Sequence, residues 1–261
     1  MAFAFSKAEI EQFSTEGWVA VPDFWNPHEI AGMRADLERL KREGKLRNVA
    51  TDGDGKTASE TKANLQLCPL WPHSALFQAM PLAPKVGEAV RQLIGDPILL
   101  HLDQVFLKPG KQGVGTNWHQ DNAYFQIPDP LKGTALWTAV HPATVANGTM
   151  RIIPRTFHTL LEHRRDEDSN HHIRCWPDEK EAVTVELPAG GALFFAYGTP
   201  HCTGANTTDT ERAGVALHFI RADISSAAQG GFAPGQRTLL TPTDNSDVWD
   251  TAVATALAES S

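Results

Sequence analysis

Cysteines, long apolar runs and surplus basic charge are all scarce in this sequence of 261 residues. The three cysteines, Cys68, Cys175 and Cys202, include no Cys-x-x-Cys pair, which argues against a zinc ribbon and a disulfide framework. We therefore expect reduced thiols. No segment approaches the roughly 20 apolar residues of a membrane helix, and the N-terminus lacks the pattern of a secretory signal. The protein is expected to be cytoplasmic and without membrane contact.

The charge balance is acidic, since 31 Asp and Glu residues outnumber 23 Lys and Arg residues and give a net charge of −8. Such a chain lacks the basic surface that attracts a phosphate backbone, which argues against a nucleic-acid partner. Hydrophobic residues make up 41% and charged residues 21% of the sequence, as in a folded globular protein. The length suits one domain, and we expect a single domain over residues 1–261.

The first part of the chain carries helix signals. A capping box formed by Ser6 and Glu9 predicts a short helix, and Asn26 followed by Pro27 predicts a longer amphipathic helix that ends at Gly44. A short strand is expected between the two helices. These elements are typical of a scaffold that packs on a sheet.

From about residue 98 onward, short β-type runs alternate with Gly, Pro and Asn. Few helical stretches interrupt them, which favours an antiparallel double sheet of the jelly-roll kind over parallel βαβ winding. The polar stretch Glu162–Glu181 is predicted to be a long loop beside a site. The predicted strands are Trp18–Val21, Leu99–Lys108, Ala135–Val140, Met150–Ile153, Ala182–Leu187, Ala192–Ala196 and Ala213–Arg221. We thus expect a helical support at about 1–95, a jelly-roll core at about 98–225 and a C-terminal tail at about 241–261.

Three side chains form a candidate metal site. His119 and Asp121 lie two positions apart, so both would leave the same face of an extended strand. His201 follows another predicted strand. Two histidines and one carboxylate are the ligand set of non-haem Fe(II) oxygenases, because they leave positions open for co-substrate and O₂. A second His-x-Asp pair begins at His101, and the spacing alone does not choose between the two.

Arg212 comes eleven residues after His201, at the start of a predicted strand. A hairpin of that length would bring its guanidinium back beside His201. There it could bind a remote carboxylate while the keto-acid end of the same molecule chelates iron, as a dicarboxylate such as 2-oxoglutarate can. The alternative is a surface arginine paired with Glu211 or Asp209.

Further motifs follow one another in order along the chain: Phe106-Leu-Lys-Pro-Gly110, His119-Gln-Asp121, Leu136-Trp-Thr-Ala139, Asn147-Gly148, Ile153-Pro154, Phe194-Phe195, His201 and Arg212. Together with the N-terminal helices, this set resembles the phytanoyl-CoA dioxygenase family of Fe(II)- and 2-oxoglutarate-dependent oxygenases. The family places its His-x-Asp motif after the Lys-Pro-Gly loop, which selects the pair at His119 over the pair at His101.

The resemblance implies a double-stranded β-helix, which is a form of jelly roll related to the cupins. It also implies Fe(II) as the metal and 2-oxoglutarate as the co-substrate. The residues so implied are His119, Asp121 and His201 for iron, and Arg212, Thr203, Gln104, Lys108 and Trp137 for 2-oxoglutarate.

The implied reaction is the hydroxylation of a C–H bond in a small molecule, with O₂ consumed and succinate and CO₂ released. Desaturation, epoxidation and ring closure use the same centre and stay open. Halogenating relatives carry a small residue in place of the metal carboxylate, so Asp121 favours hydroxylation. Two alternatives are a cupin-like metalloprotein, such as an isomerase or an O₂-only dioxygenase, and a non-catalytic ligand-binding jelly roll. The residues expected to face the substrate are Tyr124, Phe125, His171 and Arg174.

Overall fold

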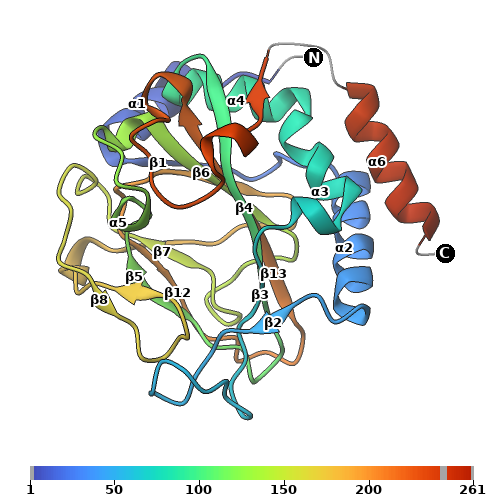
Figure 1. Cartoon of the computed structure of the whole chain (residues 1–261), viewed down its shortest axis with the longest axis vertical. Coiled ribbons are helices and arrows are strands. Elements are labelled where there is room, and N and C mark those ends of the chain that lie inside the picture. The colour runs from blue at the N-terminus through green and yellow to red at the C-terminus, as the bar shows by residue number, and fades with distance from the viewer. Residues whose placement is uncertain (1–2, 242–245, 260–261) are drawn as a thin grey trace.

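The computed structural model describes residues 3–241 and 246–259, and two antiparallel sheets form its centre (Figure 1). The larger sheet has the strand order β1 (Trp18–Val21), β11 (Ala192–Ala196), β6 (Gly133–Ala139), β13 (Arg212–Arg221), β4 (Ile98–Lys108), β3 (Leu65–Leu67) and β2 (Arg47–Asn48), with β14 (Leu239–Leu240) paired to β4. The smaller sheet has the order β10 (Val183–Val185), β7 (Met150–Ile152), β12 (His201–Thr203) and β5 (Thr116–His119). The two sheets form the jelly roll that the sequence predicted.

Helices pack on the larger sheet, and one short helix lies beside the smaller sheet. The α-helices are α1 (Lys7–Glu16), α2 (Pro27–Arg42), α3 (Ala75–Ala79), α4 (Pro84–Ile94), α5 (Asn122–Phe125), which follows β5, and α6 (Ser246–Glu259). Short 3-10 turns connect several elements: η1 (Trp71–His73), η2 (Met80–Leu82), η3 (Pro130–Lys132), η4 (Glu179–Glu181), η5 (Ala222–Ile224) and η6 (Pro234–Gln236). None of the described helices combines the length and the apolar character that crossing a membrane requires.

Successive side chains of the larger sheet point alternately toward the helices and toward the smaller sheet. On β11, Phe194 belongs to the core that the helices share, whereas Phe195 belongs to the core between the two sheets. Leu136 and Trp137 of β6 divide in the same way. Successive side chains of a strand leave opposite faces, so one face of this sheet is free to build the interior between the sheets.

The predicted capping box at Ser6 forms, and the predicted helix start at Asn26 also carries a capping box. The Ser6 hydroxyl accepts a hydrogen bond from the backbone N–H of Glu9, and the Asn26 side chain accepts one from the backbone N–H of Glu29. The first helix ends at Gly17, whose φ of 84° lies in the left-handed region that glycine tolerates. The predicted strands are all present, with β1 and β11 at their predicted bounds and the other five within two residues of them.

The C-terminal tail predicted at about 241–261 is helical over residues 246–259. Helix α6 packs on α2 and α3, as Figure 1 shows for α2. The Trp249 side chain is buried, and its Nε1 donates a hydrogen bond of 2.8 Å to Oε1 of Glu29. Residues 242–245 and 260–261 lie outside the described residues.

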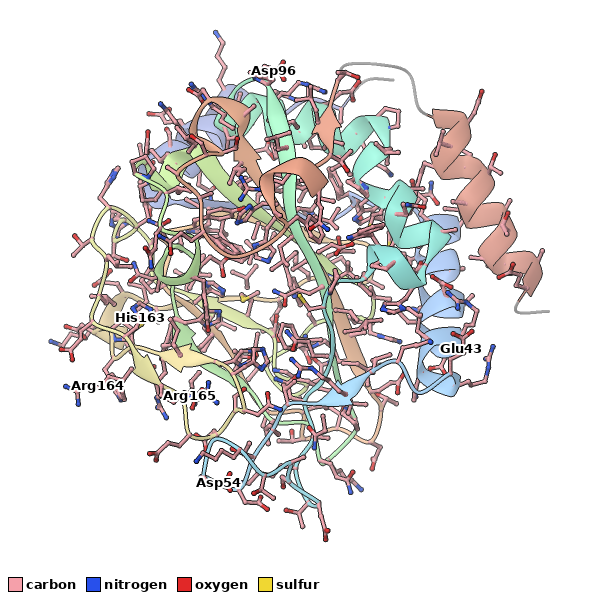
Figure 2. The ribbon with its side chains drawn as sticks, in the orientation of Figure 1. Glu43, Asp54, Asp96, His163, Arg164 and Arg165 are labelled. Carbon is pink, nitrogen blue, oxygen red and sulfur yellow. The ribbon has the colours of Figure 1, made fainter. Side chains whose placement is uncertain are left out.

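The stretch Glu162–Glu181, predicted as a loop, contains a hairpin of β8 (Arg164–Arg165) and β9 (Ile173–Arg174), followed by η4. Both residues of β8 are exposed (Figure 2). Strands of two residues offer too few positions for a recognisable alternation, and for this reason the sequence pattern did not predict them.

Candidate metal and co-substrate site

A cavity of about 300 Å³ lies between the two sheets. On the side of the larger sheet, alternate residues of β4 and β13 line it, because side chains two apart on a strand share a face. The strands β5, β7 and β12 line the opposite side. Side chains from distant parts of the sequence therefore line one cavity.

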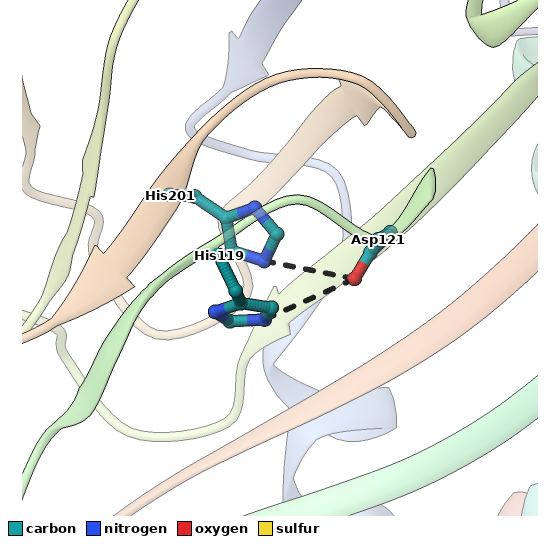
Figure 3. Close-up of side chains that lie close together, drawn as sticks. All are labelled: His119, Asp121 and His201. Atoms are coloured by element: carbon teal, nitrogen blue, oxygen red, sulfur yellow. Dashed lines mark ion pairs between the residues drawn. The ribbon is translucent and has the colours of Figure 1, made fainter. Parts of the chain in front are cut away.

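The three predicted metal ligands converge at this cavity (Figure 3). Their candidate ligand atoms all lie within 4.8 Å of one another. Oδ1 of Asp121 is 3.9 Å from Nε2 of His119 and 3.8 Å from Nε2 of His201. The two histidines are direct partners in the pairing of β5 with β12, which explains how residues 119 and 201 come together.

The predicted placement of His119 and Asp121 on one extended strand is wrong. Strand β5 ends at His119, and Asp121 has helical backbone angles, with φ −57° and ψ −33°, where the chain enters α5. The turn, and not the two-residue strand repeat, directs the carboxylate toward the two imidazoles.

Both imidazoles are fixed in the form that can bind a metal through Nε2. Nδ1 of His119 lies 2.8 Å from the carbonyl oxygen of Asn117, and Nδ1 of His201 lies 2.9 Å from that of Thr199. A carbonyl only accepts hydrogen bonds, so each Nδ1 carries the proton and each Nε2 keeps a free lone pair. Burial lowers the pKa of His119 to about 4 and that of His201 well below its ordinary value. Both rings are therefore neutral at neutral pH.

No lysine or arginine of the described residues pairs with Asp121. Burial raises the pKa of its carboxyl group to about 8, and Oδ2 has no hydrogen-bond partner among the described residues. Burying an ionised carboxylate without a counter-charge is costly. A divalent cation between Oδ1 and the two Nε2 atoms would supply that charge, so the donor set fits a metal ion.

Two buried cations occupy the other end of the cavity. Arg212 and Lys108 are partners in the pairing of β13 with β4, and both line the cavity. The Arg212 guanidinium donates to the carbonyl oxygen of Gly148, and Lys108 Nζ donates to the carbonyl oxygen of Gly204 at 2.6 Å. Burial lowers the pKa of Arg212 to about 10, and burial and the charge of Arg212 lower that of Lys108.

No carboxylate of the described residues forms an ion pair with either cation. The alternative partners considered for Arg212 are occupied, since Glu211 pairs with Lys41 and Asp209 pairs with Lys111. Two uncompensated cations in a buried cavity favour an anionic ligand.

Thr203 adds a hydroxyl donor at the same end. Its Oγ1 accepts hydrogen bonds from Lys108 Nζ at 2.6 Å and from the backbone N–H of Thr116 at 3.0 Å. Both lone pairs are thus in use, and the hydroxyl proton remains for an acceptor. A carboxylate held there would meet an ammonium, a guanidinium and a hydroxyl, all of which donate.

Trp137 forms a wall of this end. The Arg212 guanidinium carbon lies 5.5 Å from the centre of the Trp137 ring, within the range of a cation–π contact. Gly214 makes room for the indole, because a Cβ at that position would come within 2.5 Å of two indole atoms.

The predicted hairpin between His201 and Arg212 does not form. Strand β12 belongs to the smaller sheet and β13 to the larger one, so the two residues approach the cavity from opposite sheets. All but one of the other predicted residues also line the cavity: Gln104, Lys108, Thr203 and Trp137 for the co-substrate, and Tyr124, Phe125 and His171 for the substrate.

Arg174 is the exception, since it is absent from the cavity lining. Its Nη1 lies 3.6 Å from a carboxylate oxygen of Asp168, and its guanidinium packs over Trp176 at 5.1 Å. The acidic neighbour holds the side chain at the surface hairpin. The structure therefore does not support the predicted role of Arg174 in substrate binding.

Sequence reasoning did not predict that Gln66 and His218 line the cavity. The position of His218 could have been predicted. It lies six residues after Arg212 on the same strand, so both side chains leave the same face of the sheet. The position of Gln66 could not have been predicted, because β3 has only three residues and shows no recognisable alternation.

Comparisons with known proteins identify a family and relatives of this chain. The model of the phytanoyl-CoA dioxygenase (PhyH) family matches residues 13–214. Ectoine dioxygenase of Stutzerimonas stutzeri (strain A1501) is 23% identical over 247 residues, covering 85% of this chain and 78% of that protein. A probable phytanoyl-CoA dioxygenase of Caenorhabditis elegans is 28% identical over 154 residues, covering 54% of this chain and 49% of that protein.

Two solved structures illustrate the shared fold. The non-haem α-ketoglutarate-dependent carbocyclase SnoK from nogalamycin biosynthesis superposes with a TM-score of 0.74 at 19% identity, covering 91% of this chain and 97% of that chain. EctD from S. alaskensis, crystallised with 2-oxoglutarate and 5-hydroxyectoine, gives a TM-score of 0.67 at 18% identity, covering 84% of this chain and 77% of that chain.

Proposed function

The chain belongs to the phytanoyl-CoA dioxygenase family and is an Fe(II)- and 2-oxoglutarate-dependent dioxygenase, and from this premise we propose that His119, Asp121 and His201 hold the iron. The observation that carries the proposal is the convergence of three candidate ligand atoms within 4.8 Å, opposite two buried cations. A metal that accepts nitrogen and oxygen ligands and leaves coordination positions open suits this set.

We propose that 2-oxoglutarate binds with its far carboxylate at Arg212, Lys108 and Thr203. The cations compensate its charge, and the Thr203 hydroxyl donates a further hydrogen bond. The keto-acid end then points toward the histidines and Asp121, and Trp137 closes the side of the space. Iron and 2-oxoglutarate, when bound, supply the oxidising power for C–H cleavage with O₂, and 2-oxoglutarate leaves as succinate and CO₂.

The aromatic lining has two tasks in this proposal. Phe125, Trp137 and Phe195 are buried at the cavity and keep water away from the reacting atoms. The Tyr124 hydroxyl accepts a hydrogen bond of 2.9 Å from the backbone N–H of Ile173. This bond ties the start of β9, two residues after His171, to the Tyr124 side chain at the cavity.

We propose that the substrate is a small organic molecule whose reacting part is uncharged and carries a hydrogen-bond donor. Apart from Arg212 and Lys108, no lysine or arginine of the described residues lines the cavity. Burial also lowers the pKa of His171 to about 4 and keeps that ring neutral. Oε1 of Gln66 is buried at the cavity without a hydrogen-bond partner among the described residues, so a substrate hydroxyl or amine can donate to it. Hydroxylation is the proposed outcome.

An anaerobic titration tests the cofactor assignment. Addition of Fe(II) and then 2-oxoglutarate is expected to produce the weak visible charge-transfer band of the chelated keto acid. A screen of small neutral metabolites should then reveal a compound that stimulates succinate formation in air. Fe(II) binding without the band would favour the cupin-like alternative that does not use 2-oxoglutarate. Neither band nor succinate would favour a binding protein.

A further inference from the structure

We propose that His218 is a positioning residue, which donates its Nδ1–H to Oδ2 of Asp121 and thereby keeps Oδ1 directed at the metal. This inference rests on the proposed role of Asp121 as an iron ligand. It assigns a function to a buried imidazole that belongs to neither the metal ligands nor the co-substrate end.

The two oxygens of Asp121 face different partners. Oδ1 faces Nε2 of His119 and of His201, at 3.9 and 3.8 Å. Oδ2 faces Nδ1 of His218 at 3.4 Å. Neither Oδ2 nor this Nδ1 has a hydrogen-bond partner in the described part of the chain, and both atoms are buried. Two unpaired buried polar atoms that face each other at this distance need only a small rotation to form a hydrogen bond.

The neighbouring strands fix which nitrogen of His218 carries the proton. Nε2 of Gln66 donates to Oε1 of Gln104 at 3.0 Å, so the Gln104 oxygen is occupied and its NH₂ group is turned the other way. That NH₂ group lies 3.3 Å from Nε2 of His218. An amide nitrogen only donates, so Nε2 of His218 accepts, and in the neutral ring the proton is on Nδ1.

The three side chains form a relay across adjacent strands. Gln66 lies on β3, Gln104 on β4 and His218 on β13, and these strands are neighbours in the larger sheet. The relay ends at Asp121, across the cavity from that sheet. Since all three side chains line the cavity, the sheet that binds the co-substrate also orients the metal carboxylate.

Hydrogen bonds to the outer atoms of metal ligands set their orientation and affinity. With Oδ2 held by His218, the carboxylate offers one oxygen to the metal. Without that bond, the carboxylate is free to rotate. Oδ1 would then no longer be held facing the two Nε2 atoms, and the affinity for the metal would fall.

The test compares His218→Asn with His218→Leu. The two replacement side chains have nearly the same shape, and the Asn amide nitrogen occupies about the place of Nδ1, so the variants differ chiefly in the ability to donate. Calorimetric titration of the metal-free proteins with Co(II) is expected to show a loss of affinity of roughly 10- to 100-fold for His218→Leu. His218→Asn should retain most of the wild-type affinity. Equal affinities in the two variants, whether both high or both low, overturn the proposal.

Nitrogen NMR of the metal-free wild-type protein provides a second measurement that does not depend on the folding of a variant. The His218 ring is expected to be neutral with its proton on Nδ1. A proton on Nε2 contradicts the proposed hydrogen bond from His218 to Asp121.

The proposed metal site and the proposed role of His218 fail in distinguishable ways. If the wild-type protein does not bind Co(II) at all, the metal site is wrong. Normal binding by both the wild type and His218→Leu leaves the metal site intact and rejects the role of His218.

Discussion

Arg212 and Lys108 are direct partners in the pairing of β13 with β4, and both point their charges into the same cavity without a carboxylate partner among the described residues. Like charges in a buried space repel each other, and desolvation adds to the cost. The arrangement is reasonable for a protein that binds an anion there. The two cations would bind the anion at one end of the cavity, and the metal ligands would bind a cation at the other end.

Replacement of Arg212 by Met is expected to weaken 2-oxoglutarate binding by about 2–5 kcal/mol, because a buried charge-assisted pair loses one partner. Arg212→Lys should restore part of the affinity, since it keeps the charge but not the fork of donors. Arg221→Met, at the half-buried far end of the same strand, is the matched control. Calorimetry with the Co(II)-loaded proteins measures the dissociation constant, and an unchanged constant in Arg212→Met would place the co-substrate elsewhere.

Gly214→Ala is expected to distort the co-substrate wall. The added methyl group would lie 2.5 Å from indole atoms of Trp137, and overpacking of this kind typically costs about 1–3 kcal/mol. Thermal unfolding should show a lower midpoint, and the affinity for 2-oxoglutarate should fall as Trp137 moves. Gly235→Ala is the control, because a methyl group there has no neighbour within 4 Å. Equal stability of the two variants would contradict the close packing of Trp137 on β13.

Metal binding is expected to depend on pH through Asp121. Burial raises the pKa of this carboxyl group to about 8 in the metal-free protein, so below that pH the metal must displace a proton. The affinity for Co(II) should therefore rise with pH, by about tenfold per unit well below pH 8, and level off above it. His119 and His201 add no proton in this range because burial lowers the pKa of each. A constant affinity between about pH 6 and pH 8 would contradict the raised pKa of Asp121.

The C-terminal helix is expected to contribute strongly to stability. Trp249 is buried between α6 and α2, with its indole N–H on Glu29, and truncation of a buried tryptophan typically costs about 3–5 kcal/mol. Urea unfolding of Trp249→Ala should show that loss. Val248→Ala is the matched control, because Val248 is exposed on the same helix. A small effect in both variants would mean that α6 is not docked as described.

The sequence predicted the jelly roll and the meeting of His119, Asp121 and His201, because strand runs and ordered motifs are local patterns. It did not predict how these residues meet. The turn at Asp121 follows from α5, which has only four residues. The sequence also did not predict that β12 and β13 lie in different sheets. A spacing of eleven residues between His201 and Arg212 is compatible with a hairpin or with a crossing between the sheets.

Of the residues that lead to Asp121, His218 could have been predicted from the sequence and Gln66 could not. The alternation that starts at Arg212 would have placed His218 on the cavity face. Gln66 could not be placed, because its position depends on the register of the short strand β3 against β4. Arg174 was predicted from its loop, but the nearby Asp168 holds it outside the cavity. Long-range pairings of this kind are set by tertiary packing and leave no periodic trace in the sequence.

Stoichiometric Fe(II) binding by two matched variants tests the central claim most directly. Asp121→Asn and Asp103→Asn make the same change in the two His-x-Asp pairs of the chain. The Asp103 carboxylate accepts hydrogen bonds from the backbone N–H groups of Leu70 and Trp71 and is not a proposed metal ligand. The account predicts one tightly bound Fe(II) per chain in the wild type and in Asp103→Asn, and loss of tight binding in Asp121→Asn. Tight binding that survives in Asp121→Asn, or that disappears in a folded Asp103→Asn, would contradict it.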